Sequence, residues 1–299
     1  MITRRALASL VLSLSIALAG ALPASAADGA QAPAKPAAQA PVAQGSSVAA
    51  GVRGADISWP NCPKGMGVSG RRTQGLPLPT AKAQFFVIGL TNGRAFTRNP
   101  CLSAHLDVAR ERDVAVSAYT MLSYPNAAER VTHGSSGPFG TATYADRIAN
   151  VGYAQAAFAL DTMAAAEFPS PFVWIDVEPR AERRWSRTPA NNQALIRGAL
   201  RAAQDRGIGS GIYTYALAWR QITGDMTLDV PLWAPGHSRA RTFAAKMRQS
   251  AASCARVGFT GGPLVMAQWV WRNRDYNVTC TVIETVSTPM WVRLGESST

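Results

Sequence analysis

The sequence has little of several features that mark particular classes of protein. Beyond its N-terminus, no stretch reaches the roughly 18 apolar residues that a membrane-spanning helix needs. Only four of its 30 basic residues are lysine, and no basic run is interleaved with aromatic residues, so we do not expect it to bind nucleic acid. With 16% charged and 47% hydrophobic residues, the composition is that of a globular protein.

The N-terminal segment 1–26 has the three parts of a signal peptide. Arg4 and Arg5 supply positive charge, 6–22 is apolar, and Ala24-Ser25-Ala26 offers the small residues of a cleavage site. A membrane anchor is the alternative, but the apolar run is short and is followed by a proline and small residues. We expect a secreted, extracytoplasmic protein with no stable membrane insertion after cleavage.

Composition divides the rest of the chain. The Ala-, Pro- and Gln-rich stretch 27–53 indicates a flexible linker, 54–288 a single barrel domain and 289–299 a tail. The formal net charge of +12, or +10 without the two arginines of the signal peptide, favours polyanionic partners. For an exported protein the nearby polyanion is the cell envelope, so we expect the protein to associate with cell-wall polysaccharide. We expect it to be a monomer.

Cysteine and histidine are scarce, and their spacing is not that of a metal site. No C-x-x-C occurs and the three histidines are scattered, so zinc is disfavoured and we expect no metal and no cofactor. An even number of cysteines in an exported chain favours disulfides, for which three pairings are possible. Sequential pairing would contribute about 3–4 kcal/mol for each bond. The residues concerned are Cys62, Cys101, Cys254, Cys280, His105, His133 and His237.

The segment 172–178, F-V-W-I-D-V-E, alternates as a strand does, and the proline after it predicts that the strand ends there. Because successive side chains of a strand point to opposite faces, Asp176 and Glu178 share a face with Trp174. Burying two carboxylates on an enclosed face costs free energy, which indicates that the two acids have a function together. A salt bridge to one of the arginines that follow is the structural alternative.

Other strands and helices alternate along the chain. This alternation predicts crossover helices and a parallel sheet, and seven or eight strands over roughly 230 residues favour one irregular TIM-type (β/α) barrel. Active sites of such barrels lie at the C-terminal ends of the strands, where Asp56, Asp176 and Glu178 fall. The remaining strands are expected at 54–59, 84–91, 114–121, 211–215, 230–234, 264–271 and 275–283, and the helices at 100–111, 144–168, 188–207 and 241–255.

A pair of neighbouring acids suits the cleavage of a glycosidic bond. One acid protonates the leaving oxygen, and a second anionic group stabilises the oxocarbenium-like centre. An ionised neighbour raises the pKa of the first acid, which keeps it protonated near neutral pH.

Five segments occur in a fixed order, followed by Asp275. They are G-A-D-I-S-W (54–59), V-W-I-D-V-E (173–178), G-I-Y-T-Y (211–215), P-L-W-A (231–234) and A-Q-W-V (267–270). In this order they resemble the lysozyme-type muramidases of glycoside hydrolase family 25, in a divergent branch of secreted actinobacterial proteins. The resemblance covers most of residues 54–283.

The resemblance implies roles for individual residues. It implies that Glu178 is the general acid and that Asp176 orients and polarises the 2-acetamido group of the sugar, whose carbonyl can itself attack the anomeric carbon. It implies that Asp56 is a third catalytic acid, which binds and polarises the substrate from the opposite rim, and that Asp275 binds substrate in the same site. Tyr213 and Trp233, in the matching segments, are expected to bind substrate by stacking on sugar rings.

Two segments depart from the family's pattern. The K-A-T-E-G type segment after the second strand is G-L-T-N-G (89–93) and lacks the acid, and W-P-N-C (59–62) lacks the usual glutamine. Two hypotheses follow. The first is an exported glycoside hydrolase that cleaves N-acetylated cell-wall glycan, most plausibly peptidoglycan. The second, motivated by these departures and by the positive charge, is a barrel without catalysis that binds cell-wall glycan or an envelope partner.

Overall fold

The computed structural model describes residues 47–236, 239–256 and 258–295. The expected signal peptide, most of the expected linker and His237 lie outside the described residues. Among the helices that are described, none is long and apolar enough to cross a membrane.

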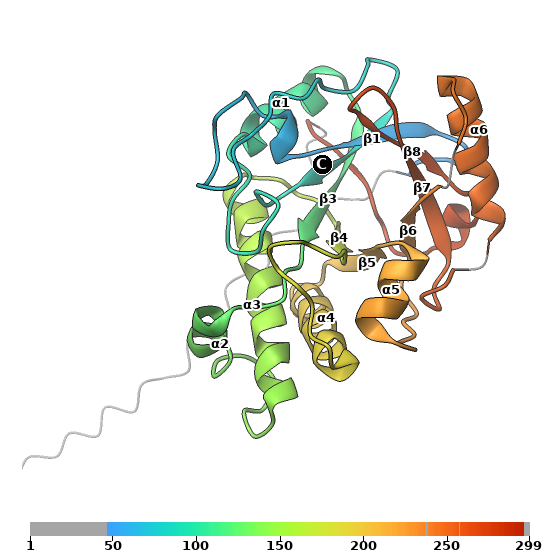
Figure 1. Cartoon of the computed structure of the whole chain (residues 1–299). Helices are drawn as coiled ribbons and strands as arrows, with labels where there is room; N and C mark the ends of the chain where they lie inside the picture. Colours follow the sequence, from blue (N-terminus) through green and yellow to red (C-terminus); the bar gives the residue numbers. More distant parts are fainter. Residues whose placement is uncertain (1–46, 237–238, 257, 296–299) are drawn as a thin grey trace, which may run out of the picture. The chain divides into compact units, whose positions relative to one another are not determined.

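Eight strands close into a ring, as predicted (Figure 1). Strands β1 to β8 follow one another around it in chain order, and β8 pairs with β1. The strands are β1 (Arg53–Ile57), β2 (Phe85–Gly89), β3 (Ala115–Met121), β4 (Phe172–Asp176), β5 (Gly209–Tyr213), β6 (Leu232–Pro235), β7 (Leu264–Val270) and β8 (Asp275–Thr279).

The prediction of an all-parallel sheet was wrong for β8. Neighbouring strands from β1 to β7 are parallel, but β8 is antiparallel to both β7 and β1. The connection between β7 and β8 is only residues 271–274, in which Arg272 and Asn273 have positive φ. A connection of that length makes a hairpin, because a parallel pair needs a crossover of a dozen or more residues.

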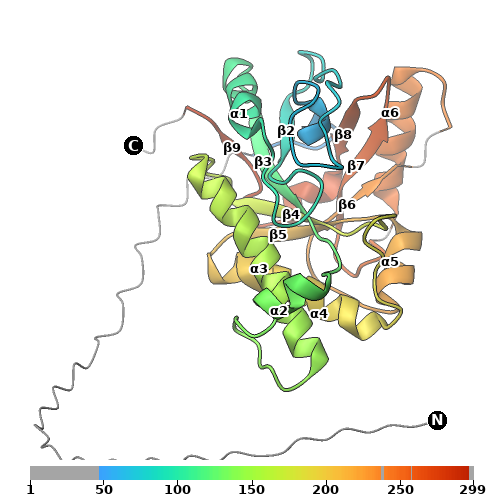
Figure 2. The same ribbon diagram turned by 60° about the vertical axis from the view of Figure 1, so that its left-hand side comes forward.

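Helices surround the ring, and α3 and α4 lie side by side against one part of it (Figures 1 and 2). Four helices match the predicted ranges, whereas α2, which begins with a capping box of Asn126 and Glu129, and α5 were not predicted. The helices are α1 (Leu102–Glu111), α2 (Ala127–His133), α3 (Tyr144–Ala165), α4 (Pro189–Asp205), α5 (Ala216–Thr223) and α6 (Phe243–Ala252), with 3₁₀ turns at Trp59–Asn61, Ser253–Ala255 and Thr281–Thr285.

Side chains of the strands alternate between the inside of the barrel and the helices. Inside lies an aromatic cluster in which the ring centroids of Trp174 and Trp233 are 5.9 Å apart. On the opposite face of β4, Val173 and Ile175 are fully buried in the layer between strands and helices. The alternation predicted for this strand is therefore the one found.

The barrel unit extends beyond the predicted range 54–288. Residues predicted as tail form strand β9 (Val292–Arg293), which pairs with the start of β3. Trp291 is buried against Phe85, the first residue of β2, with ring centroids 4.6 Å apart, so it lies toward the N-terminal ends of the parallel strands. Before β1, the backbone N–H of Gly51 donates to the carbonyl oxygen of Thr279 at 2.9 Å.

Both disulfides join cysteines that are consecutive in the sequence. Cys62 bonds to Cys101 and Cys254 to Cys280. The first ties the turn after β1 to the start of α1, and the second ties the segment after α6 to the end of β8. His105 lies beside the first pair, but sulfurs bonded to each other are not thiolate ligands for a metal.

Helices α3 and α4 approach closely through two glycines. A Cβ added at Gly198 would overlap the carbonyl oxygen of Ala149, and one at Gly152 would overlap that of Leu195. The two helix backbones touch at these glycines, which have no side chain to keep the helices apart.

We predict that Gly198→Ala lowers the free energy of unfolding by about 1–3 kcal/mol, because neither backbone can give way without a shift of a whole helix. Gly140→Ala is the matched control, since its nearest new contact would be Asp146 Oδ2 at 3.8 Å. Urea denaturation of both variants checks the prediction. Equal stability of the two variants would contradict it.

Candidate active site

Four carboxylates lie at the C-terminal mouth of the barrel. Asp56 lies near the end of β1, Asp176 ends β4 and Glu178 follows two residues later. Asp275 begins β8, and because β8 is antiparallel its first residue lies at the same edge as the ends of the parallel strands. Asp56 and Asp275 are direct partners in the β1–β8 register. The closure of the ring thus brings together acids that are far apart in the sequence.

Asp56 is held by two side-chain amides. Its Oδ1 accepts hydrogen bonds from Gln268 Nε2 at 2.9 Å and from Asn277 Nδ2 at 2.8 Å. Each amide is oriented in turn, since the hydroxyl of Tyr213 donates to Gln268 Oε1 at 2.7 Å and Trp233 Nε1 donates to Asn277 Oδ1 at 2.8 Å. The amide oxygens are occupied, so the NH₂ groups point to the carboxylate.

The pKa of Asp56 is raised to about 8, by burial first and then by the negative charge of Asp275, although the two amide hydrogen bonds oppose the rise. Asp275 itself has a pKa of about 6, because of burial and then the charge of Glu178. Asp56 is therefore mostly protonated at neutral pH.

Asp176 and Glu178 are close to one arginine but are not clasped by it. Arg180 Nη2 lies 3.9 Å from Asp176 Oδ2 and 3.7 Å from Glu178 Oε2, beyond hydrogen-bond distance. Asp176 Oδ1 is buried and has no hydrogen-bond partner among the described residues. The Glu178 side chain is 25% exposed and reachable from solvent. A salt bridge alone does not account for this pair.

Both carboxyl groups hold their protons more strongly than usual. The pKa of Asp176 is raised by burial first and then by the charge of Glu178. Burial also raises the pKa of Glu178, and the charge of Arg180 opposes that rise.

The phenol of Tyr213 lies among all four acids. Its pKa is raised by burial first and then by the charges of Glu178, Asp176, Asp56 and Asp275. One phenol is thus close enough to be affected by the charge of all four acids, which lie at the same end of the barrel.

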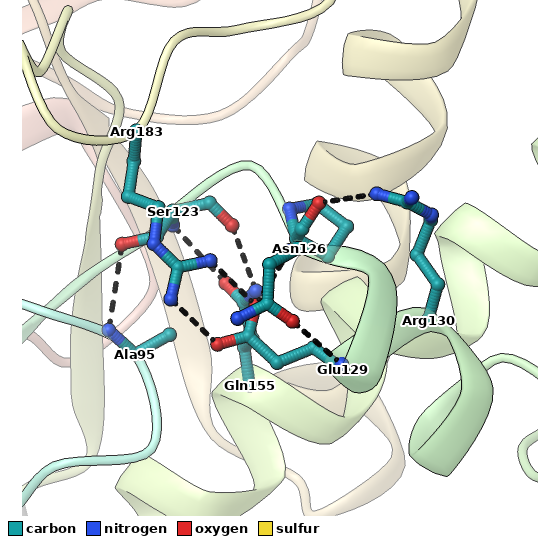
Figure 3. Close-up of polar contacts among 8 residues, drawn as sticks. Ala95, Ser123, Asn126, Glu129, Arg130, Gln155 and Arg183 are labelled. Atoms are coloured by element: carbon teal, nitrogen blue, oxygen red, sulfur yellow. Dashed lines mark hydrogen bonds and ion pairs between the residues drawn. The ribbon is translucent and has the colours of Figure 1, made fainter.

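The loop that carries Glu178 is fixed to the rest of the fold. Trp185 Nε1 donates to the carbonyl oxygen of Glu178 at 2.8 Å. Further along the loop, Arg183 makes two hydrogen bonds to the carboxylate of Glu129 in α2, at 2.9 and 3.0 Å (Figure 3). Beside it, Gln155 of α3 bonds both backbone groups of Ser123, just after β3 (Figure 3).

The expected stacking roles of Tyr213 and Trp233 do not match their positions. Trp233 is 2% exposed and its ring is enclosed by Tyr119, Trp174 and Tyr213, so no ring face is open to a sugar. Tyr213 is 7% exposed and packs on Trp233 with ring centroids 4.3 Å apart. Both aromatic side chains point to the inside of the barrel. There they hold the amides of Gln268 and Asn277, which in turn bind Asp56.

Sequence reasoning did not identify Gln268 and Asn277 as site residues. Gln268 lies on β7 and Asn277 on β8, and both side chains point to the inside of the barrel, where they reach Asp56 of β1. The A-Q-W-V segment contained the signal for Gln268, but its meaning depends on the β7–β8 register, which brings Gln268 opposite Asn277.

The barrel resembles solved structures at low sequence identity. A family GH25 lysozyme from Aspergillus fumigatus matches with a TM-score of 0.50 and 16% identity, over 76% of this chain and 93% of its own. A muramidase from Trichobolus zukalii matches with a TM-score of 0.47 and 16% identity over 76% and 93% of the two chains, and a bacterial lysozyme from Streptomyces coelicolor with 0.49 and 16% over 77% and 92%.

The fold is thus that of a lysozyme-like α/β barrel. A family model described as Lysozyme-like protein 1 matches residues 109–239, which include the acidic strand. The predicted resemblance is confirmed for the fold: the barrel is similar to that of a family GH25 lysozyme, and a lysozyme-like family model matches part of the chain. No curated protein matches the chain in sequence.

We predict that the protein is more stable at pH 5 than at pH 8. Its folded state keeps a proton on Asp56 up to about pH 8, whereas the unfolded chain releases it near pH 4, so this contribution is lost as pH rises between those values. Urea unfolding should show a fall on the order of 1–3 kcal/mol over this range.

Asp56→Asn should reduce that fall, because a neutral amide still accepts the two hydrogen bonds through its oxygen. Asp107→Asn, at an exposed position on α1, should leave the fall unchanged. An identical pH dependence in wild type and Asp56→Asn would show that Asp56 is ionised throughout.

Proposed function

We propose that this protein is a glycoside hydrolase that cleaves N-acetylated cell-wall glycan, with peptidoglycan as the main substrate. The observation that carries the proposal is the convergence of four carboxyl groups at the mouth of a lysozyme-type barrel, among which Glu178 has a raised pKa and is open to solvent. Glycosidic cleavage needs a carboxyl group that can give a proton, and burial raises the pKa of Glu178, which favours its protonated form.

Glu178 acts as the general acid. Its proton passes to the oxygen of the leaving sugar while the bond from that oxygen to the anomeric carbon breaks. The fixed loop, held through the Glu178 carbonyl by Trp185, keeps the carboxyl group in reach of the bond.

Asp176 acts on the 2-acetamido group. A nucleophilic carboxylate must be ionised, and the raised pKa of buried Asp176 makes it a poor one. As a hydrogen-bonding partner it can orient the acetamido group, whose carbonyl oxygen then attacks the anomeric carbon. Water opens that intermediate and its proton returns to Glu178. We assign this contact to the buried Asp176 Oδ1, which has no hydrogen-bond partner among the described residues.

Export places the enzyme with its substrate. The signal-peptide features of residues 1–26, the two disulfides and the positive net charge all support an extracytoplasmic protein at the cell wall. The second candidate is a binding protein without turnover, which the positive net charge and the missing acid in 89–93 favour.

We predict that Glu178→Gln lowers the rate of reducing-end release from peptidoglycan at least about 100-fold, because the amide has no proton to give. Wild-type activity should fall as pH rises through the raised pKa of Glu178. Asp161→Asn, at an exposed position on α3, is the control and should retain full activity.

The same variants separate the two candidates. A hydrolase loses turnover in Glu178→Gln while it still sediments with cell walls. Wild-type protein that releases no reducing ends but sediments with walls equally well before and after this substitution is a binding protein, and the hydrolase proposal then fails.

A further inference from the structure

We propose that Arg71, Arg94 and Arg180 form a subsite for an oxyanion, a carboxylate or phosphate group that the glycan carries beside the bond to be cleaved. The identity of the glycan rests on the proposed function, whereas the anion site rests on the arginines alone. The substrate would then be an anionic glycan and not a neutral polymer such as chitin.

The three arginines line one hollow of about 760 Å³. Its walls come from the turn after β1, the loop after β2 and the loop after β4, so segments far apart in the sequence meet there. Trp59 and Glu182 line the same hollow. The hollow adjoins the acids, because Arg180 follows Glu178 by two residues and its Nη2 lies 3.7 Å from that carboxylate.

Each of these guanidinium groups has an unused donor. The Nε atoms of Arg71, Arg94 and Arg180 are all buried, and none has a hydrogen-bond partner among the described residues. A buried N–H without a partner costs free energy, and all three belong to arginines that line the hollow, so a small rotation of each side chain would let an oxyanion there accept from them. Planar guanidinium groups bind carboxylate and phosphate with two parallel hydrogen bonds, which makes arginine suited to such a site.

The positive charges also repel one another. The pKa of Arg71 is lowered by burial and then by the charges of Arg180 and Arg94. Bringing like charges together is unfavourable, and an anion among them relieves the repulsion.

The local sequence is built to place Arg71. Its guanidinium lies over the ring of Trp59, 5.7 Å from the centroid. Gly93 has a φ of +64°, and a Cβ there would overlap Trp59 Nε1 and press on Arg71 Nη1. Asn92 is fully buried and donates from Nδ2 to the Arg71 carbonyl oxygen at 3.2 Å. These contacts hold the side chain at the hollow without using its Nε.

Glu182 is the one acid that lines the hollow among the residues described there, and it pairs with Arg71. Its side chain is 40% exposed, so it can swing away when a stronger anion enters. In this arrangement Glu182 takes the place of the anionic ligand and competes with it.

The test measures binding by calorimetry with inorganic phosphate, a muramic-acid-containing glycan fragment, the matching neutral chitin oligomer and a phosphorylated chitin fragment. Wild-type protein should bind the anionic fragments at least about tenfold more tightly than the neutral one. The stronger of the carboxylated and phosphorylated fragments identifies the group. Arg71→Gln and Arg94→Gln should each abolish the preference.

Two further variants exclude a structural role. Glu182→Gln should strengthen anion binding, whereas it would resemble Arg71→Gln if Arg71 served only to pair with Glu182. Arg184→Gln, an exposed arginine in the same loop, should change nothing. Thermal melting of all variants confirms that they are folded, and Arg71→Lys provides a milder change if Arg71→Gln is not.

Equal binding of neutral and anionic fragments by folded wild type would overturn the inference, as would an unchanged preference in both arginine variants. Hydrolysis of peptidoglycan by those variants at the wild-type rate, with no preference for anionic glycan, would overturn it while leaving the proposed function intact. Anion-selective binding without turnover would instead overturn the hydrolase and keep the subsite.

Discussion

The pairing of β8 with β1 is the constraint on which the site depends. It closes the ring, and because β8 runs against its neighbours it brings Asp275 directly opposite Asp56. The same register places Asn277 beside β1, and the β7–β8 register brings Gln268 opposite Asn277, so that both amides reach Asp56 Oδ1. A slip of one residue would turn these side chains to the outer face and remove the whole network.

The arginines do not neutralise the acids although they are neighbours, because Arg180 lowers the pKa values of Asp176 and Glu178 by less than burial raises them. An arginine within hydrogen-bond distance of Asp176 or Glu178 would ionise both and remove the proton that acid catalysis needs. Instead Arg180 stays 3.7 to 3.9 Å from them, and burial keeps their pKa values raised. Its buried Nε has no hydrogen-bond partner among the described residues. Arg180 thus borders both the four acids and the basic hollow without neutralising either.

Much of this arrangement follows from local sequence, and the rest depends on long-range register. The alternation in 172–178 predicted the strand and the shared face of its two acids, because a period of two is a local property. The antiparallel course of β8 was missed, since its turn uses Arg272 and Asn273 at positive φ where glycine would have signalled a hairpin. The burial of Trp233 was missed as well, because a strand pattern gives the alternation of faces but not which face is enclosed.

The departures from the family's pattern gain a physical meaning from the hollow. The second-strand segment lacks its acid, and Asn92 there uses its amide to hold the loop of Arg71, while Gly93 leaves room for Trp59 and the guanidinium. Trp59, in the other departing segment, supplies the ring on which Arg71 rests. An acid in the second-strand segment would bring negative charge beside these arginines and compete for them, as Glu182 does now. The missing acid and the proposed anion subsite at the same rim are therefore consistent with each other, and both leave the four acids at the barrel mouth in place.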